Sequence, residues 1–526
     1  YIRETLEGTS SREDGSFDFK TTTKGEITLC AQMLGYTPAY MKGEASGMGR
    51  VHLVLHPQNV ALQEVFVTAG NYRLQGSSKW KEMSPVSIAT TAGAVGDIYN
   101  GIALLPGVQA AGESGKLMVR GGDSREAQTF IDEMHVLSPY TYTPENSAAR
   151  GRYSPFLFEG INFSSGGFSS DYSQSLSSVL PLTTKDESPV TKIGVSLLSV
   201  GMGGGGTKAW ANSSLSFNGD YQNIGPYNKL FPDSYDWINP YQRISGESQF
   251  RKTLANKGIW KTYLAYDRTS FAQHTSEAFN PINRRLDFEE DNLYLNSTFR
   301  KTLGKGYKFF SGVAISSNKK RMDGARLASD ALKETESEIH LKIKGEKRYS
   351  NLYKLTAGAE SMLRRDSLSY MYPPAIQTGG EISHSINSLF LINDFNLSAS
   401  LQGNVSARLE QTSLNDHWQI LPRASLTYKM KDFYLSAIAG LYQQLPENSF
   451  LLRNQHLSAE RCWQYILGAY HEANGKTFRL EVYNKKYHNL ATNLNNNFTS
   501  DGYGYARGID LFLNDREVVK NLEYML

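Results

Sequence analysis

The 526-residue chain has a formal net charge of +3, which is too small to favour binding to a nucleic acid. It is 20% charged and 12% aromatic, with 31 Tyr and 46 Gly, so it is polar overall but rich in residues that suit β-strands. No segment approaches the roughly 18 consecutive apolar residues of a membrane-spanning helix, which excludes helical membrane proteins. The two cysteines, Cys30 and Cys462, match no metal-ligand spacing and are expected to be unpaired thiols.

Residues 1–57 are expected to form a small β-domain. Polar and apolar residues alternate over 16–20, and further strand-like segments lie near 26–32 and 50–55. The sequence opens at Tyr1 without an initiator Met. We therefore expect a processed or incomplete start.

Residues 58–72 are predicted to be a linker, and residues 73–188 a second domain. This second domain is rich in Gly and Ser and contains short apolar segments that resemble strands. Its best helix candidate covers 96–105. Pro106 and Gly107 are expected to end that helix, because Pro cannot continue a helix and Gly favours its C-terminal cap.

From 189 to 526, strand-like segments follow one another with almost no helical pattern. The clearest is predicted to be one unbroken strand from Phe395 to Glu410, in which apolar odd positions alternate with polar even positions. Ordinary strands have about five or six residues, so a strand of this length needs a large sheet. The predicted fold class is therefore all-β dominated, with a transmembrane antiparallel β-barrel that faces lipid on one side and a wet lumen on the other.

The connections between these segments alternate in length, which is typical of outer-membrane barrels. Short turns are predicted at 203–206, 256–258, 303–306, 344–350, 393–394, 431–432, 474–475 and 514–517. Longer loops are predicted near 220–243, 268–290, 318–334, 364–384, 411–420, 444–459 and 489–502. This pattern gives about 16 strands. Because the last residues, 521–526, are themselves strand-like, we expect more of the barrel to follow them.

Several segments resemble parts of TonB-dependent receptors of the bacterial outer membrane. Residues 12–38 are similar to the carboxypeptidase-regulatory-like domain that precedes some of these receptors, with its first strand missing. Residues 104–132 and 166–180 resemble the plug domain, and 479–487 is similar to a barrel strand. The plug motif comprises Pro106, Gly107, Val119, Arg120, Gly121, Gly122, Ile131 and Asp132.

The resemblance implies a barrel of about 22 strands, filled by the plug and preceded by a small β-sandwich domain. It implies active import of a scarce nutrient, either a metal chelate or a glycan, across the outer membrane of a Gram-negative bacterium. The implied partners are a TonB-type energy-coupling protein in the periplasm, outer-membrane lipid and an extracellular small-molecule or oligomeric substrate. A surface lipoprotein partner is left open but is not favoured, because glycan importers usually have Val-Asp-Gly where this chain has Ile131-Asp132-Glu133.

The resemblance also implies an energy-coupling segment, the TonB box, just before the plug. The matching residues are Leu62, Gln63, Glu64, Val65, Phe66, Val67 and Thr68. An extended, alternating segment is suited to adding itself as a strand to the edge of a partner's sheet. An ordinary last strand of the small domain, or a plain linker, is the alternative.

No catalytic or cofactor signature is found, so we expect no enzyme activity, no cofactor and no metal site. The glycine run 201–206 lies between strands and is interpreted as a turn and not as a nucleotide-binding loop. Four histidines are expected in or beside extracellular loops, where a solvated histidine is the more common case: His274, His384, His417 and His456. Four charged residues are expected to line the lumen and pair with the plug: Arg408, Glu410, Arg423 and Lys429.

Three functions remain open from the sequence. Active import is favoured over a passive porin or adhesin, which needs neither a plug nor a coupling segment. A secreted soluble all-β enzyme or binding protein is the third, and the two-sided loop pattern does not suit it. The candidate substrate contacts are aromatic: Tyr140, Tyr142, Tyr235 and Trp237. Aromatic residues near strand ends, however, more often form the interfacial girdle of a barrel.

Overall fold

The computed structural model divides the chain into two compact units, Tyr1–Phe66 and Val67–Leu526. The structure describes residues 2, 5, 7–9, 11–12, 15–31, 36–37, 39–49, 51–57, 71–73, 93–94, 96–110, 115–144, 149–186, 190–254, 258–277, 280–324, 330–372, 376–473, 476–519 and 522–525. Among these residues, no helix is long and apolar enough to cross a membrane.

The first unit contains two short antiparallel strand pairs. They are β1 (Glu26–Ala31) with β3 (Ala39–Glu44), and β2 (Tyr36–Thr37) with β4 (His56–Pro57). Ile2, Ile27 and Leu29 form its buried core, and Phe19 and Leu53 pack against them. The strands predicted over 16–20 and 50–55 are wrong, because neither segment forms a strand in the described residues. Alternation there puts Phe19 and Leu53 on the core, but neither segment joins a sheet in the described residues.

The second unit is dominated by one antiparallel sheet of seventeen strands, each bonded to its neighbours in chain order. The predicted fold class is confirmed. The number of strands is one more than the 16 or so that the sequence suggested. In chain order the strands are β12 (Lys192–Leu198), β13 (Gly201–Ala209), β14 (Ser213–Asn223), β15 (Asp236–Leu254), β16 (Gly258–Glu277), β17 (Asn280–Gly304), β18 (Tyr307–Asp323), β19 (Ala331–Arg348), β20 (Tyr353–Tyr372), β21 (Ile376–Asn396), β22 (Leu401–Thr412), β23 (Gln419–Met430), β24 (Phe433–Gln444), β25 (Glu460–Ala473), β26 (Lys476–Leu494), β27 (Asn497–Val519) and β28 (Leu522–Met525).

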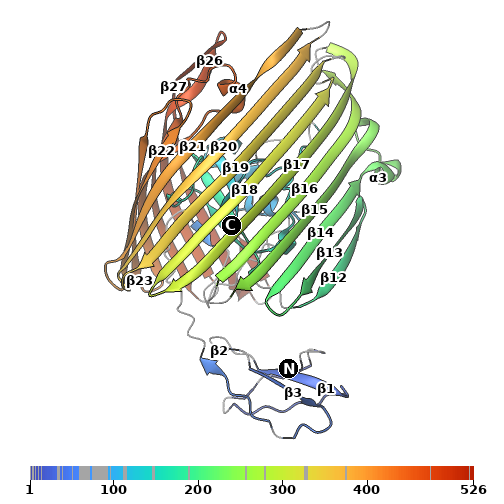
Figure 1. Ribbon diagram of the computed structural model, residues 1–526, viewed down its shortest axis with the longest axis vertical. Helices are drawn as coiled ribbons and strands as arrows, with labels where there is room; N and C mark the ends of the chain where they lie inside the picture. The colour runs from blue at the N-terminus through green and yellow to red at the C-terminus, as the bar shows by residue number, and fades with distance from the viewer. Residues whose placement is uncertain are drawn as a thin grey trace. The chain divides into compact units, whose positions relative to one another are not determined.

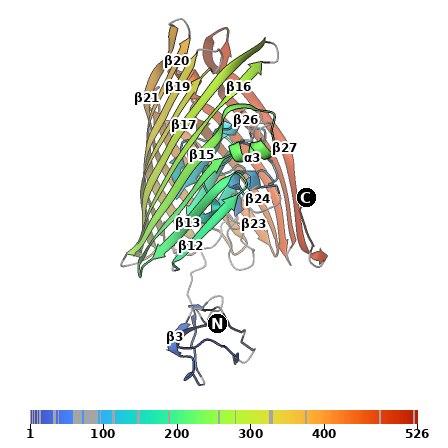
Figure 2. The same cartoon turned by 90° about the vertical axis from the view of Figure 1, so that its right-hand side faces the viewer.

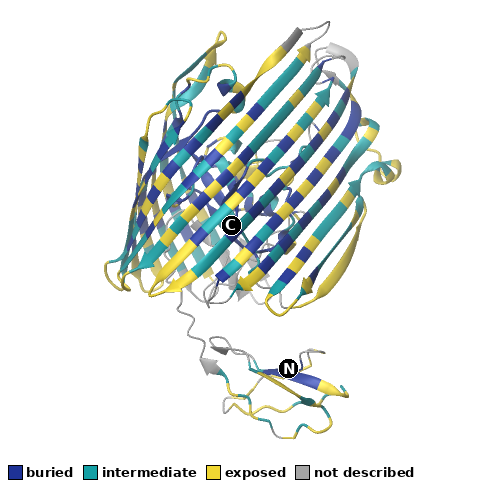
Figure 3. Ribbon diagram, in the orientation of Figure 1, coloured by how far each residue is buried: buried dark blue, intermediate teal, exposed yellow. Residues whose placement is uncertain are grey.

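This sheet, hereafter the wall, curves round an inner domain, and its edge strands β12 and β28 are not paired with each other in the described residues (Figures 1 and 2). Its two faces differ in chemistry, and the alternation of burial runs along the strands in Figure 3. On β19, the outward Ile339, Leu341 and Ile343 are 42%, 46% and 54% exposed. His340 and Lys342, between them, are buried. Exposed apolar and buried charged residues are the arrangement of a barrel wall that faces lipid.

The unbroken strand predicted from Phe395 to Glu410 is wrong. β21 ends at Asn396 and β22 begins at Leu401, with a turn between them. The hydroxyl of Ser398 accepts hydrogen bonds from the backbone N–H groups of Ser400 and Leu401, at 3.2 and 3.0 Å. Serine closes such turns through its side chain, whereas the alternating pattern continues through the turn and conceals it.

The turn predicted at the glycine run 201–206 is also wrong, because these residues form part of β13. Gly203 pairs with Ser196 on β12 and with Asp220 on β14. A Cβ at Gly205 would lie 2.8 Å from the carbonyl oxygen of Phe217. Glycine here therefore permits the close approach of neighbouring backbones in the sheet.

The two ends of the wall differ in their connections. One end, hereafter the short-turn end, has short connections, of which 210–212, 305–306, 349–352, 397–400 and 431–432 lie in the described residues. The other, the long-loop end, has the longer connections 224–235, 413–418 and 445–459, with α3 (Gly225–Leu230) and α4 (Asn448–Leu451) in the first and last of these, and also the short connections 199–200 and 495–496. The loop predicted over 268–290 is mostly strand, because β16 and β17 continue as a paired hairpin.

The inner domain, hereafter the plug, comprises the described residues of 71–186. Its five-stranded sheet has the order β5 (Asn71–Arg73), β10 (Phe158–Ser164), β11 (Ser178–Thr184), β8 (Ala127–Ile131) and β9 (Met134–Val136). A separate pair joins β6 (Val108–Ala110) to β7 (Leu117–Val119). The helix predicted over 96–105 is shorter, α2 (Ile98–Ile102), and Asp97 caps it by accepting from the N–H groups of Tyr99 and Asn100.

The plug and the wall share hydrophobic clusters. Plug residues such as Ile131 and Phe158 pack in the same cluster as Tyr263, Tyr294 and Phe310 of the wall. The plug lies within the curve of the wall in both views (Figures 1 and 2). Two short helical turns, η2 (Ser124–Glu126) and η3 (Pro155–Leu157), complete it.

Candidate functional site

Arg120 of the predicted plug motif lies at a charged contact between the plug and the wall. It follows β7 with φ of 50°, which turns its side chain away from the strand path, and that side chain is 1% exposed. Its guanidinium donates to Glu481 of β26 at 2.5 Å and to Asp510 of β27 at 2.8 Å. Gly107, at φ of 72°, lies close by, and a Cβ there would approach Asp510 Oδ2 to 2.6 Å. Two carboxylates on one buried guanidinium form a charge-assisted anchor.

Asp132 of the same motif makes a second charged contact. Its carboxylate accepts from Lys261 of β16 at 2.7 Å and from the backbone N–H of Thr184 at 3.1 Å. Lys261 also donates to Asp186, at 3.1 Å. The motif residues that carry charge therefore both face the wall.

Arg152 makes a third contact, which the sequence did not reveal. It lies 2.5 Å from Asp267 of β16 and 2.7 Å from Glu290 of β17, and all three side chains are buried. Asp267 is shared with Arg243 of β15. Pairs separated by more than a hundred residues leave no spacing signal in a single sequence.

A fourth contact combines His135 and Asp171 of the plug with β19. His135 Nδ1 lies 2.7 Å from Glu338 Oε1. Lys344 forms ion pairs with Asp171, at 3.1 Å, and with Glu133. Burial alone would raise the pKa of Asp171, but the ammonium groups of Lys344 and Lys342 hold that pKa well below its ordinary value. The Asp171 carboxylate therefore stays ionised inside the wall.

Arg408 and Arg423 contact the plug backbone. Arg408 donates to the carbonyl oxygen of Ser170 at 3.3 Å, and Arg423 to that of Ser169 at 2.5 Å. Glu410 accepts from the Gln174 side chain at 2.8 Å. Lys429, in contrast, is exposed, and its ammonium lies over the Tyr434 ring.

An aromatic cluster lies towards the long-loop end, and it brings together two of the four candidate substrate contacts. Tyr142 of the plug stacks on Phe288, with ring centroids 3.9 Å apart. Trp237 meets Phe271 edge to face at 6.0 Å. Tyr241 stacks on Phe271 as well, at 6.3 Å. Tyr142, Trp237 and Tyr241 remain partly exposed, so aromatic surface is available to a ligand there.

The other two candidates are placed differently. Tyr140 packs against Tyr99 within the plug, with ring centroids 4.7 Å apart, and its hydroxyl accepts from the N–H of Leu117 at 3.2 Å. Tyr235 lies 5.0 Å from Trp237, at the edge of the aromatic cluster. The candidate coupling segment, Leu62–Thr68, lies outside the described residues.

The four histidines do not form one cluster, although His417 and His456 line the same cavity at the long-loop end. His274 pairs with Asp236 at 3.0 Å. His384 is a buried, inward residue of β21, whereas His417 and His456 belong to two different connections of the long-loop end. In the described part of the chain, no group of three or more His, Cys, Asp or Glu side chains is arranged to hold a metal ion.

Solved structures share this fold. The ferric enterobactin receptor (PfeA) of Pseudomonas aeruginosa, in its G324V form, superposes with a TM-score of 0.67 at 12% identity, over 87% of this chain and 79% of that one. The siderophore receptor PirA of Acinetobacter baumannii gives 0.66 at 13% identity, over 86% and 80%. The copper transporter OprC gives 0.64 at 11% identity, over 81% and 75%. No protein-family model matches the sequence, and the comparison with curated proteins gives no match.

Proposed function

We propose that this chain is an outer-membrane transporter that imports a metal chelate into a Gram-negative bacterium, driven by a TonB-type partner. The observation that carries the proposal is a plug that fills the wall and is held to it by buried ion pairs, such as those of Arg120 and Arg152. A passive pore gains nothing from a filled lumen. The solved structures with this fold are named as receptors and a transporter of siderophores and copper, which favours a metal-bearing substrate.

Besides the hydrophobic clusters that they share, the plug and the wall meet through polar contacts, and these polar contacts suit a plug that has to move. An apolar interface loses its full hydrophobic stabilisation when water enters, at about 25 cal/mol per Å². A hydrogen bond that is exchanged for a bond to water changes the free energy by only about 0.5–1.5 kcal/mol. Contacts such as those of Arg423 with the plug carbonyls can therefore be replaced by water as the plug rearranges.

The aromatic cluster is the proposed contact for the substrate. Tyr142 belongs to the plug, whereas Trp237 and Phe288 belong to the wall. A planar aromatic ligand group that stacks there would touch both parts at once. Binding would then be sensed directly by the plug, which is the part that has to respond.

The coupling segment is proposed to be Leu62–Thr68, captured by strand addition. Backbone hydrogen bonds supply much of the affinity in this mode, so the identity of one side chain matters little. Pro behaves differently, because it removes a donor and restricts the preceding residue. Val65→Pro is therefore expected to abolish uptake, whereas Val65→Ala should have a weak effect.

The test is accumulation of radiolabelled ferric chelate beside its surface binding, in a deletion strain that expresses each variant. Loss of accumulation with intact binding in Val65→Pro would support energy-coupled import. Normal accumulation in that variant would instead favour a passive pore. If the strain that expresses the protein grows on glycans but on no iron or copper chelate, a glycan would replace a metal chelate as the proposed substrate.

A further inference from the structure

The wall splits between β23 and β24 at the long-loop end. The two strands pair from Met430 and Phe433 as far as Arg423 and Gly440, and no further, although every residue here is described. Beyond this point β23 stays paired with β22, and β24 with β25. The next residue of β23 is Pro422, which has no N–H to donate to the ladder. Pairing therefore fails where the sequence places Pro422.

The end of β24 follows the plug instead of β23. The side chain of Gln444 donates to the carbonyl oxygen of Arg125 at 2.8 Å, and the N–H of Leu445 donates to Gln174 at 3.0 Å. Gln443 reaches Glu410 of β22 at 3.2 Å. These bonds hold residues 442–446 in a buried position. The gap that is left between the unpaired ends of β23 and β24 is hereafter the wedge.

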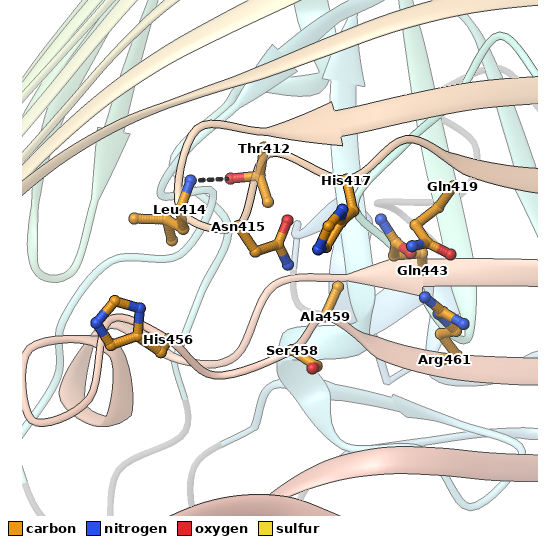
Figure 4. A pocket seen from close by; sticks show the side chains of 10 residues that line it. All are labelled: Thr412, Leu414, Asn415, His417, Gln419, Gln443, His456, Ser458, Ala459 and Arg461. Carbon is orange, nitrogen blue, oxygen red and sulfur yellow. Dashed lines mark hydrogen bonds between the residues drawn. The ribbon is translucent and has the colours of Figure 1, made fainter.

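The wedge contains a cavity of about 390 Å³ (Figure 4). Asn415 and His417 line it from one connection, Ser458 from another, and Gln419, Gln443 and Arg461 from three neighbouring strands. No Asp or Glu lines it, among the described residues. Arg461 Nε and Gln443 Oε1 are buried without a hydrogen-bond partner in the described part of the chain. A cationic donor and an amide acceptor thus await partners in a cavity without negative charge.

The surroundings of the wedge indicate the source of a ligand. Arg461 lies between Glu460 and Cys462, which are buried and face inward, so it belongs to the outward face of β25. On the outer surface beside the wedge, Trp418 is 49% and Ile420 66% exposed. Trp463 and Tyr465 stack there, with centroids 6.1 Å apart. Outward aromatic residues near strand ends mark the level of lipid headgroups.

We propose that this wedge binds the phosphate-bearing, hydroxylated headgroup of a lipid in the surrounding membrane. The guanidinium of Arg461 and the imidazole of His417 would take the phosphate oxygens, and the amides of Gln419 and Gln443 the hydroxyl groups. Because Gln443 also contacts Glu410, which bonds to Gln174, the occupied wedge adjoins the seat of the plug.

The experiment uses the full chain in detergent, with native mass spectrometry to measure binding of bisphosphorylated lipid A and of phosphatidylcholine. Arg461→Gln removes a charge-assisted hydrogen bond, so lipid A should bind about tenfold more weakly or worse. Arg365→Gln is the matched control, because Arg365 is an exposed arginine of β20 that pairs with Glu381. It should bind lipid A as the wild type does. Equal binding by wild type and Arg461→Gln would overturn the proposal.

A second experiment, with a soluble phosphate compound, distinguishes a lipid headgroup from a free phosphate as the ligand. Glucose 1-phosphate is titrated by calorimetry into the same preparations. Weak or absent binding supports a lipid ligand, whereas binding as tight as that of lipid A, and equally dependent on Arg461, would overturn it. If Arg461→Gln does not fold, the exposed loop variant His417→Ala replaces it. A several-fold weaker affinity for lipid A supports the proposal, and an unchanged affinity overturns it.

Discussion

The outward and inward faces of the wall are made by the same strands, yet they depend on different kinds of contact. Outward residues such as Leu341 meet a fluid environment, where one apolar side chain can stand in for another. Inward residues such as Lys342 and Lys344 meet fixed partners on the plug. The outer face therefore requires only that its side chains be apolar, whereas the inner face requires particular residues that pair with the plug. Single substitutions on the two faces should reveal this difference.

The largest effect is expected inside, at the buried pair between plug and wall. Arg120→Ala would leave Asp510 without its guanidinium in a buried site, at a cost of about 3 kcal/mol or more to plug seating. Glu481 retains Arg479 at 2.7 Å, which keeps the loss towards the lower end of the usual range. The measurement is the urea concentration at which the plug becomes sensitive to protease.

Arg268→Ala is the control for this variant. Arg268 lies 3.8 Å from Glu289 and 3.7 Å from Asp291, and its side chain is 47% exposed. Exposed pairs contribute about 0–1 kcal/mol. Similar shifts in the two variants would mean that burial of the Arg120 pair adds nothing to seating.

The next effect concerns the outer face. Leu341→Arg would place a cation in hydrocarbon, at a cost of roughly 2–4 kcal/mol if the position is near the membrane midplane. Leu303→Arg, beside the short-turn end, should cost only about 0–1 kcal/mol, because a charge there reaches the interface. For both variants, the measurement is the fraction of protein that assembles into membranes. It is read from the migration of unheated samples in gel electrophoresis. Equal tolerance of the two changes would show that β19 does not face lipid at Leu341.

The smallest effect is expected at the aromatic cluster, where a partly exposed residue is removed. Trp237→Ala should weaken binding of a ferric chelate with aromatic groups about tenfold, which corresponds to about 1.4 kcal/mol. Trp210→Ala is the matched control, because Trp210 is exposed at the short-turn end. Titration of both variants with the chelate measures the difference in affinity. Equal affinities would show that the cluster is not part of the binding site.

The sequence predicts the outer face better than the inner one for a physical reason. Alternation is a local property, so the wall and a turn such as 431–432 could be found from it. It failed at Ser398, where a side-chain hydrogen bond closes a turn without interrupting the pattern. It failed again over 201–206, because glycine favours turns but also permits crowded strands.

The inner face could be predicted only where a motif pointed to it. Arg120 and Asp132 were singled out by resemblance to the plug, and both face the wall. Arg152 and His135 were missed, because their partners are remote in sequence and lie in strands whose alternation looks like that of any other. The roles proposed for Leu62–Thr68 and for Tyr140 remain predictions.

The proposed import requires the plug to move against the inner face of the wall. Ser170 of the plug and Ser406 of β22 are both buried, and their hydroxyl oxygens lie 2.9 Å apart. The double variant Ser170→Cys with Ser406→Cys places two thiols at this contact, and formation of the disulfide between them is checked by mass spectrometry without reduction. The two single variants control for the native cysteines, Cys30 and Cys462, which are buried and form no disulfide.

The decisive measurement is accumulation of the chelate in cells that carry this double variant, before and after a reducing agent. Oxidised cells are expected to bind the chelate at the surface but not to accumulate it, and reduction is expected to restore accumulation. Full accumulation with the disulfide formed would show instead that the substrate passes a plug that is fixed to the wall at this contact.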